Sequence, residues 1–229
     1  MRIAGADYDT ARAPASTSRL IPSRYPPVTL LDEALTAADR DAAFELAGWT
    51  NDRLVRTRIA RLPESQQVYG RPNASIVMAA FLHGSVGGLR FSDGMLGAWY
   101  ASSEVRTALL EVANGLRKEI SLSAITAKAE TYREYAARLS GAFVDVMGRH
   151  PEFHDPDDAT YPAPQAFGES VRDHVPADGI TGIRYESVRN PGAENWVCYH
   201  PPAVEDVVQA RHFRVEVPAT GKVVVRTLA

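Results

Sequence analysis

Apolar residues recur at helical spacing through much of the first half of the chain. Over residues 31–61 they lie on both sides of Gly48, and we predict two helices that break near this glycine. The second of these helices is expected to be capped at Thr50 or Asn51. The run over 74–82 is apolar throughout, so periodicity predicts a buried element there without distinguishing a helix from a strand.

A longer amphipathic helix is predicted over about residues 103–120, with Ser102 or Ser103 as its cap. Its apolar stripe consists of Val105, Leu109, Val112, Leu116 and Ile120. Glu111 falls well off this stripe at 100° per residue, so by itself it is interpreted as a solvated surface carboxylate.

The second half of the chain alternates between apolar and polar residues, as strands do, and contains frequent turn residues. A β-like stretch is predicted over 127–146 with a turn at Ser140-Gly141, and the last two strands are expected to form a hairpin around Thr220-Gly221. The other predicted strands cover residues 18–27 (ending at prolines), 98–101, 180–187, 195–199, 208–217 and 222–228. A loop over 149–164 and a short helix over 163–174 are predicted between the strands that end by residue 146 and those that begin at residue 180.

Helices toward the front and strands toward the back indicate an α+β fold rather than a doubly wound sheet. The 229 residues fit one large domain, which we expect over residues 17–229. Residues 1–16 are polar and rich in alanine, and are expected to form a flexible N-terminal arm.

Charge and cysteine content narrow the class of protein. The net charge of −3 gives no overall attraction to nucleic acid or to anionic membranes, and neither is expected as a partner. Cys198 is the only cysteine, which excludes an internal disulfide, and its alternating surroundings indicate a small core residue. With no apolar run of signal-peptide or membrane-spanning length, a cytoplasmic protein is expected.

Two further motifs resemble known kinds of functional site, one a metal site and the other a phosphate-binding loop. His150, His154 and Asp155 have the spacing of metal ligands, but they lie in a proline-rich stretch where the imidazoles need not converge, so a polar surface loop is favoured and no metal is expected. A glycine-rich stretch precedes a predicted strand, whereas phosphate-binding loops follow a strand and open a helix. It contains Gly84, Gly87, Gly88 and Gly94, and predicts neither a dinucleotide-binding Rossmann loop nor a P-loop.

Three segments carry more information together than separately. The first covers residues 19–27, the second runs from Leu89-Arg90-Phe91-Ser92 through Tyr100 to Glu111, and the third begins at Tyr185-Glu186-Ser187 and reaches Trp196. Tyr100 lies ten residues after Arg90, and Glu111 eleven after Tyr100. In this order and spacing, over about residues 17–217, they resemble the RES domain family, named for its arginine, glutamate and serine. Many members have Gly-Gly-Arg-Trp-Asn where this chain has Gly-Leu-Arg-Phe-Ser.

The resemblance implies an ADP-ribosyltransferase-like fold with two small, mostly antiparallel sheets around an NAD cleft and flanking helices. It also implies a toxin of a toxin–antitoxin pair that takes NAD⁺ as its substrate and cleaves the nicotinamide–ribose bond, as a glycohydrolase or a phosphorylase. The expected partner is an Xre-like antitoxin. Some members are instead ADP-ribosyltransferases, so mono-ADP-ribosylation of a cellular protein is the first alternative.

Roles for individual residues follow from the chemistry of that bond. Its cleavage passes through an oxocarbenium-like transition state, which a carboxylate beside the ribose stabilises, and Glu111 is the candidate. Arginines suit the pyrophosphate: Arg90 first, then Arg19 and Arg24. Tyr100 is expected to stack on the nicotinamide ring.

The remaining candidate residues support these. Tyr25 could flank the ring, and Ser187 could donate to the ribose or position the attacking group. Ser92 and Asn195 are counted with the residues that bind NAD⁺. Two alternatives from other classes stay open: an inactive member that only binds a partner, and a metal-dependent hydrolase that uses His150, His154 and Asp155.

Overall fold

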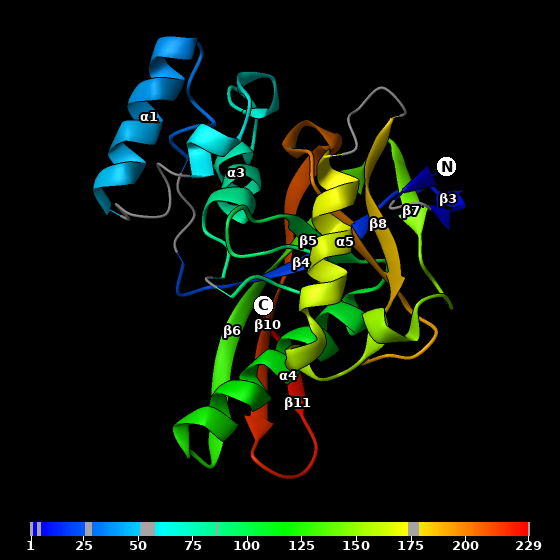
Figure 1. Ribbon diagram of the computed structural model, residues 1–229. Helices are drawn as coiled ribbons and strands as arrows, with labels where there is room; N and C mark the ends of the chain where they lie inside the picture. The colour runs from blue at the N-terminus through cyan, green and yellow to red at the C-terminus, as the bar shows by residue number, and fades with distance from the viewer. Residues whose placement is uncertain are drawn as a thin grey trace.

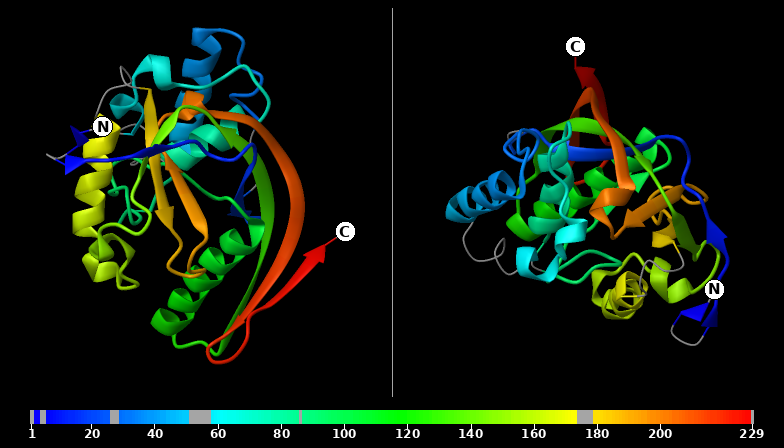
Figure 2. Two further views of the ribbon diagram at one scale, coloured as in Figure 1. Left: turned by 90° about the vertical axis from the view of Figure 1, so that its right-hand side faces the viewer. Right: turned by 90° about the horizontal axis from the view of Figure 1, so that it is seen from above.

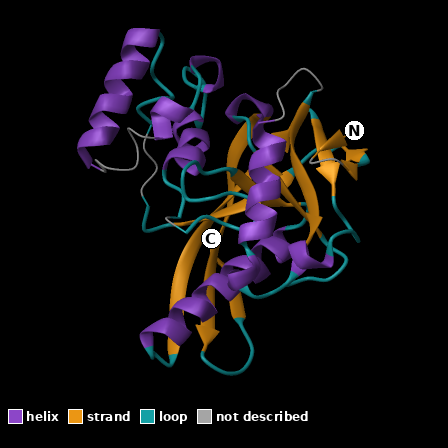
Figure 3. Ribbon diagram, viewed as in Figure 1, coloured by secondary structure: helices purple, strands orange, loops and turns teal. Residues whose placement is uncertain are grey.

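The computed structural model describes residues 2–3, 6–25, 29–50, 58–85, 87–173 and 179–228. The fold is α+β, as predicted, and is built on one nine-stranded sheet (Figures 1 and 3). In sheet order the strands are β11 (Val224–Leu228), β10 (Val204–Pro218), β6 (Ala127–Leu139), β4 (Thr17–Pro22), β5 (Trp99–Ser102), β9 (Glu194–Cys198), β8 (Ile180–Glu186), β7 (Ala142–Asp145) and β3 (Thr10–Ala11). A separate two-stranded ribbon pairs β1 (Arg2–Ile3) with β2 (Ala6–Asp7).

The expected two small sheets are merged into one, but the join is narrow. β4 pairs with β6 at six positions, whereas it pairs with β5 only where Ser18 faces Ser102. That single pair connects a half made of β11, β10, β6 and β4 to a half made of β5, β9, β8, β7 and β3. All neighbouring strands are antiparallel except β7 and β8, which are parallel. The prediction of two separate sheets is therefore wrong in number, because one backbone bridge closes the gap between them.

The helices settle the positions that the sequence left ambiguous. They include α1 (Ala37–Thr50), α3 (Ala74–Leu82), α4 (Val105–Ser123) and α5 (Pro162–Asp173), with short 3₁₀ turns η1 (Glu64–Gln66), η2 (Pro151–His154), η3 (Asp158–Thr160) and η5 (Pro201–Ala203). Residues 58–61 are helical as well, within the stretch predicted as the second helix. The apolar run over 74–82 is thus a helix. The predicted loop over 149–164 contains η2, η3 and the start of α5.

α1 corrects the prediction of a helix broken at Gly48. It begins only at Ala37, because Thr36 and Asp39 form reciprocal side-chain to backbone hydrogen bonds that cap its first turn. It then continues through Gly48 to Thr50, since one glycine costs a helix only about 1 kcal/mol. The predicted cap at Asn51 lies outside the described residues.

The start of α4 also differs from the prediction. The residue that caps it is Glu104, which makes no side-chain hydrogen bond to the helix. The Ser103 hydroxyl instead donates to Glu194 and accepts from the Trp196 indole, which ties the start of α4 to β9. The Ser103 side chain, which was predicted as a possible helix cap, makes these two hydrogen bonds instead.

The helices divide between the two faces of the sheet. α3 packs on the face that carries Trp99, Tyr135 and Trp196. On the other face, α4 packs against apolar residues of β4, β6 and β10, while α5 packs against β7, β8 and β9. Figure 2 shows α4 along the concave side of the long, curved β6–β10 pair. The two helices on this face therefore cover different halves of the sheet.

The strand predictions hold in position but not always in pairing. β6 and β7 flank the predicted turn at Ser140-Gly141, yet they do not pair with each other: β6 lies between β4 and β10, and β7 between β3 and β8. β10 begins at Val204, earlier than predicted, because irregular pairing near Asp206 and Ala210 hides the alternation. The β10–β11 hairpin is confirmed.

The N-terminal residues are not a loose arm where the structure describes them. β3 pairs with β7, and the Tyr8 side chain is buried against Phe167 of α5. The expectation of a flexible arm over residues 1–16 is therefore wrong for Tyr8–Ala11. The Tyr8 ring is buried, and the backbone of Thr10 and Ala11 pairs with β7. Among the described residues, no helix has the length and apolar character needed to cross a membrane.

Gly168 marks the closest approach of α5 to the loop that precedes β5. A Cβ atom there would lie 2.0 Å from the Phe91 carbonyl oxygen and 2.6 Å from the Tyr199 hydroxyl. We expect Gly168→Ala to lower the free energy of unfolding by about 3 kcal/mol, because neither neighbour is a flexible side-chain end that can retreat. Urea denaturation checks this.

The matched control is Gly115→Ala on α4, where a Cβ meets no atom within 4 Å. It should stabilise the protein by up to about 1 kcal/mol through helix propensity. Equal effects of the two substitutions would show that the close approach at Gly168 is not rigid.

Candidate functional site

A cleft of about 470 Å³ opens where the two halves of the sheet meet. Its walls come from α4, from β4 and β5 beside their single pair, from the loop before β5, and from η3 and the turn between β8 and β9. The predicted site residues that line it are Arg19, Arg90, Tyr100, Glu111 and Asn195. A volume of this size suits a small-molecule site.

Two side chains anchor the Glu111 carboxylate in the cleft. Its Oε1 atom accepts a hydrogen bond of 2.7 Å from the Ser187 hydroxyl and one of 2.8 Å from the Asn195 amide nitrogen. No described residue donates to its Oε2 atom, and the side chain is only partly buried. Glu111 is therefore not a solvated surface residue: one oxygen is fixed by the protein and the other faces the cleft.

Ser187 holds Glu111 from beneath the surface of the cleft, whereas Asn195 holds it from the cleft wall. The Ser187 side chain is 1% exposed, and its oxygen also accepts from the backbone N–H groups of Arg189 and Asn190. The Asn195 carboxamide oxygen accepts from Ser102 at 2.6 Å, which fixes the orientation of the amide. Both residues come from the β8–β9 hairpin, whereas Glu111 comes from α4.

Two arginines supply positive charge to the same cleft. Arg19 donates through Nη1 to the Tyr100 carbonyl and lies 4.9 Å from the centre of the Trp99 ring. Arg90 donates through Nη1 to the Phe153 carbonyl and lies over Tyr161 at 5.0 Å. Neither forms an ion pair with a described carboxylate. Burial lowers the pKa of Arg19 to about 10, so it remains charged at neutral pH.

Tyr100 presents a rigid ring to the cleft. Its hydroxyl is 2.9 Å from the Ser92 hydroxyl and accepts from the Phe91 N–H at 3.1 Å. Burial raises its pKa to about 12, so the phenol is neutral at physiological pH. Ser92 is 2% exposed and acts on the cleft through Tyr100.

The far end of the cleft contains residues that sequence reasoning missed. Lys118 of α4 donates to both carboxylate oxygens of Asp158, and Tyr161 and Arg189 lie beside them. One signal was available: Lys118 is seven residues after Glu111, which places both on one side of the helix. Nothing in the sequence linked them to Asp158, since the contact spans forty residues.

Two predicted residues lie away from the cleft. The Arg24 guanidinium pairs with Glu130 of β6 and lies over the Tyr25 ring, and Tyr25 itself is 55% exposed. Both follow the end of β4, and only the part of that strand from Ser18 to Leu20 reaches the cleft. Neither residue lines the cleft, because β4 ends at Pro22, before them.

The ring nitrogens of His150 and His154 already have partners within the fold. His150 contacts Tyr8 and Glu152 through its two ring nitrogens, and His154 uses its own on backbone groups of His150 and Glu186. The described residues contain no group of three or more side chains suited to hold a metal ion. Cys198 is fully buried, and burial raises the pKa of its thiol to about 12, which confirms a core residue.

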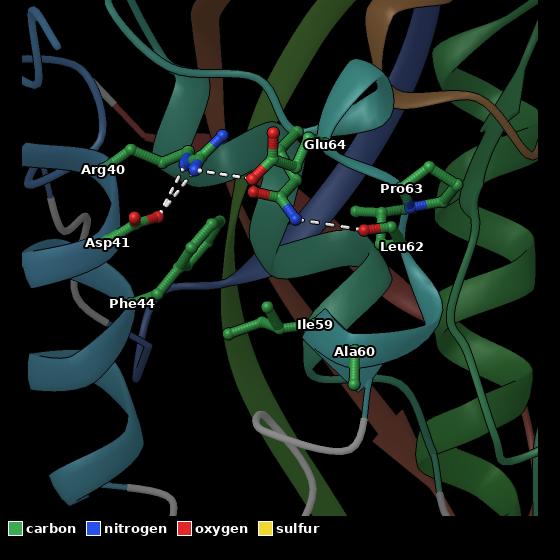
Figure 4. Close-up of a pocket in the computed structure, with 9 residues that line it drawn as sticks. Arg40, Asp41, Phe44, Ile59, Ala60, Leu62, Pro63 and Glu64 are labelled. Atoms are coloured by element: carbon green, nitrogen blue, oxygen red, sulfur yellow. Dashed lines mark hydrogen bonds and ion pairs between the residues drawn. The ribbon is translucent and has the colours of Figure 1, made fainter. Parts of the chain in front are cut away.

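A second hollow, of about 520 Å³, lies between α1 and the segment that leads to η1 (Figure 4). Its charged groups are already neutralised, because Arg40 pairs with Asp41 and Glu64. Figure 4 shows the apolar side chains of Phe44 and Ile59 below these ion pairs. It contains none of the predicted site residues, and the cleft is the better candidate.

Comparison with known proteins gives one positive result. A family model described as the RES domain matches residues 59–218. The matched segment includes Arg90, Tyr100, Glu111, Ser187 and Asn195, while Arg19 and the rest of β4 precede it. A comparison with curated proteins found no match.

Proposed function

The chain belongs to the RES domain family, and on this premise we propose that its cleft binds NAD⁺ and cleaves the nicotinamide–ribose bond. One observation carries the proposal: a carboxylate held by two donors lines a cleft that also contains three arginines without a described carboxylate partner, Arg19, Arg90 and Arg189. The first feature suits a developing cation and the second suits a pyrophosphate.

Glu111 would stabilise the transition state. As the bond to nicotinamide breaks, positive charge develops on the ribose, and a nearby carboxylate lowers the energy of that charge. The Oε2 atom, which no described residue contacts, is available for a ribose hydroxyl or for the cationic carbon. Ser187 and Asn195 act as positioning residues, because their hydrogen bonds to Oε1 set the direction of the carboxylate before the substrate arrives.

Arg90 and Arg19 would bind the pyrophosphate. A planar guanidinium binds two phosphate oxygens at once, and a cation without an internal carboxylate partner loses no ion pair when the substrate binds. Tyr100 would stack on the nicotinamide ring, and its hydroxyl contacts with Ser92 and Phe91 keep that ring from turning.

We propose water or inorganic phosphate as the acceptor, so that the reaction depletes NAD⁺ and makes the chain a toxin. Such an activity requires control in the cell, and the family resemblance predicts an Xre-like antitoxin as the partner. Co-expression of the adjacent gene should then restore growth to cells in which the chain is produced.

The experiment is an incubation of the purified protein with NAD⁺, with and without phosphate, followed by product identification. Nicotinamide with ADP-ribose indicates hydrolysis, and nicotinamide with ADP-ribose-1″-phosphate indicates phosphorolysis. A protein that gains the mass of ADP-ribose would replace this proposal with mono-ADP-ribosylation. Intact NAD⁺ under every condition would contradict cleavage altogether.

A further inference from the structure

The cleft continues along α4 beyond Glu111. Lys118 lies two turns further, about 10 Å along the helix axis, with Asn114 and Gly115 lining the wall between them. A dinucleotide whose nicotinamide ribose lies at Glu111 extends by more than this length. Its pyrophosphate would lie near Arg90 and its adenosine half toward Lys118.

A carboxylate occupies that end. Asp158 lines the cleft with its side chain 49% exposed, and Lys118 donates to its two oxygens at 2.5 and 2.6 Å. Burial by itself would raise the pKa of Asp158, but hydrogen bonds from Lys118 and Tyr161 outweigh it, so the pKa lies below its usual value and the group is charged. The only nearby ammonium group of α4 is thus neutralised by the protein itself.

We propose that Asp158 is a specificity-determining residue that accepts a hydrogen bond from the adenosine ribose 2′-hydroxyl and rejects dinucleotides that carry a 2′-phosphate. This inference rests on the proposed function and extends it from NAD⁺ cleavage to selection of NAD⁺ over NADP⁺. A carboxylate has lone pairs left after binding one ammonium group, and these suit a ribose hydroxyl.

A phosphate at the same place is disfavoured for two reasons. Its charge has the sign of Asp158, and like charges held together are repelled. The ammonium group nearest to it, Lys118, is already paired with Asp158, which leaves the Arg189 guanidinium as the cation at this end that pairs with no described carboxylate. Removing Asp158 reverses both effects, because it removes the repulsion and frees the ammonium group.

The test uses the adenosine half of the substrate, so that it does not depend on bond cleavage. Calorimetry measures the affinity of the full chain for AMP and for adenosine 2′,5′-bisphosphate. The wild-type protein should bind AMP at least about tenfold more tightly. Asp158→Asn should reduce this preference by about tenfold, mainly through tighter binding of the bisphosphate.

Two further variants make the test directional. Lys118→Met leaves Asp158 unshielded, so the preference for AMP should increase. Glu152→Gln removes a carboxylate from the neighbouring η2 turn, outside the cleft, and should leave the preference unchanged. Rates of nicotinamide release from NAD⁺ and NADP⁺ should follow the same order in the intact dinucleotides.

The outcomes separate this inference from the proposed function. Equal wild-type affinities for the two nucleotides, or a preference that Asp158→Asn does not change, would overturn the role of Asp158 while NAD⁺ is still cleaved. If the protein binds neither AMP nor NAD⁺ and releases no nicotinamide, the proposed function itself is wrong and the inference fails with it.

Discussion

Replacement of Glu111 by glutamine should lower the rate of nicotinamide release from NAD⁺ by about a thousandfold. Glutamine has the same shape, and its carboxamide oxygen can still accept from Ser187 and Asn195. The variant therefore loses the negative charge beside the ribose while the cleft keeps its form. Because the charge matters most in the transition state, kcat should fall and KM should change little.

Two companion variants make the result interpretable. Glu119→Gln removes a carboxylate from the same helix outside the cleft, where it pairs with Lys128, and should have full activity. Ser187→Ala keeps the charge of Glu111 but removes one of the two hydrogen bonds that orient its carboxylate, and should lower kcat by about tenfold. A Glu111→Gln protein as active as the wild type would mean that another group stabilises the cation.

Arg90→Ala should raise KM for NAD⁺ by about a hundredfold, because it removes a buried charge that forms no ion pair with a described carboxylate. The loss falls on binding rather than on chemistry if the guanidinium holds the pyrophosphate in both the ground state and the transition state. Arg90→Lys should recover only part of the affinity, since an ammonium group cannot bind two oxygens in a plane. Steady-state kinetics over a range of NAD⁺ concentrations measures each effect.

The control for charge alone is Arg226→Ala, on the exposed strand β11. It changes the net charge by the same amount at a site far from the cleft in the sheet order, so KM should not move. A fall in kcat at unchanged KM in Arg90→Ala would argue that this arginine acts on the reacting bond instead of the pyrophosphate.

The elements of the fold were largely predictable because they depend on local pattern. The apolar stripe of α4 has the period of a helix, and the alternation along β8 has the period of a strand. What local pattern does not contain is pairing: the turn at Ser140-Gly141 resembles that of a hairpin, but β6 and β7 join different halves of the sheet. The single pairing of Ser18 with Ser102 likewise depends on the tertiary fold, and nothing in the sequence of β4 or β5 predicts it.

The candidate site divides in the same way. Spacing along one segment was enough to select Arg90, Tyr100 and Glu111, whereas periodicity alone had assigned Glu111 to the surface. Arg24 and Tyr25 were selected because they follow the opening strand, but their distance from the cleft depends on where that strand stops pairing. Asp158 was missed because only the tertiary fold brings it to Lys118.

The narrow join within the sheet gives Glu111 a mechanical role. α4 packs mainly on the β4–β6–β10 half, while Ser187 and Asn195 belong to the other half. The hydrogen bonds that orient the carboxylate therefore also connect the two halves of the sheet. A ligand that contacts both α4 and the β8–β9 hairpin would strengthen this connection. Truncation of the Glu111 side chain would therefore remove two hydrogen bonds between the halves of the sheet as well as a carboxylate from the cleft.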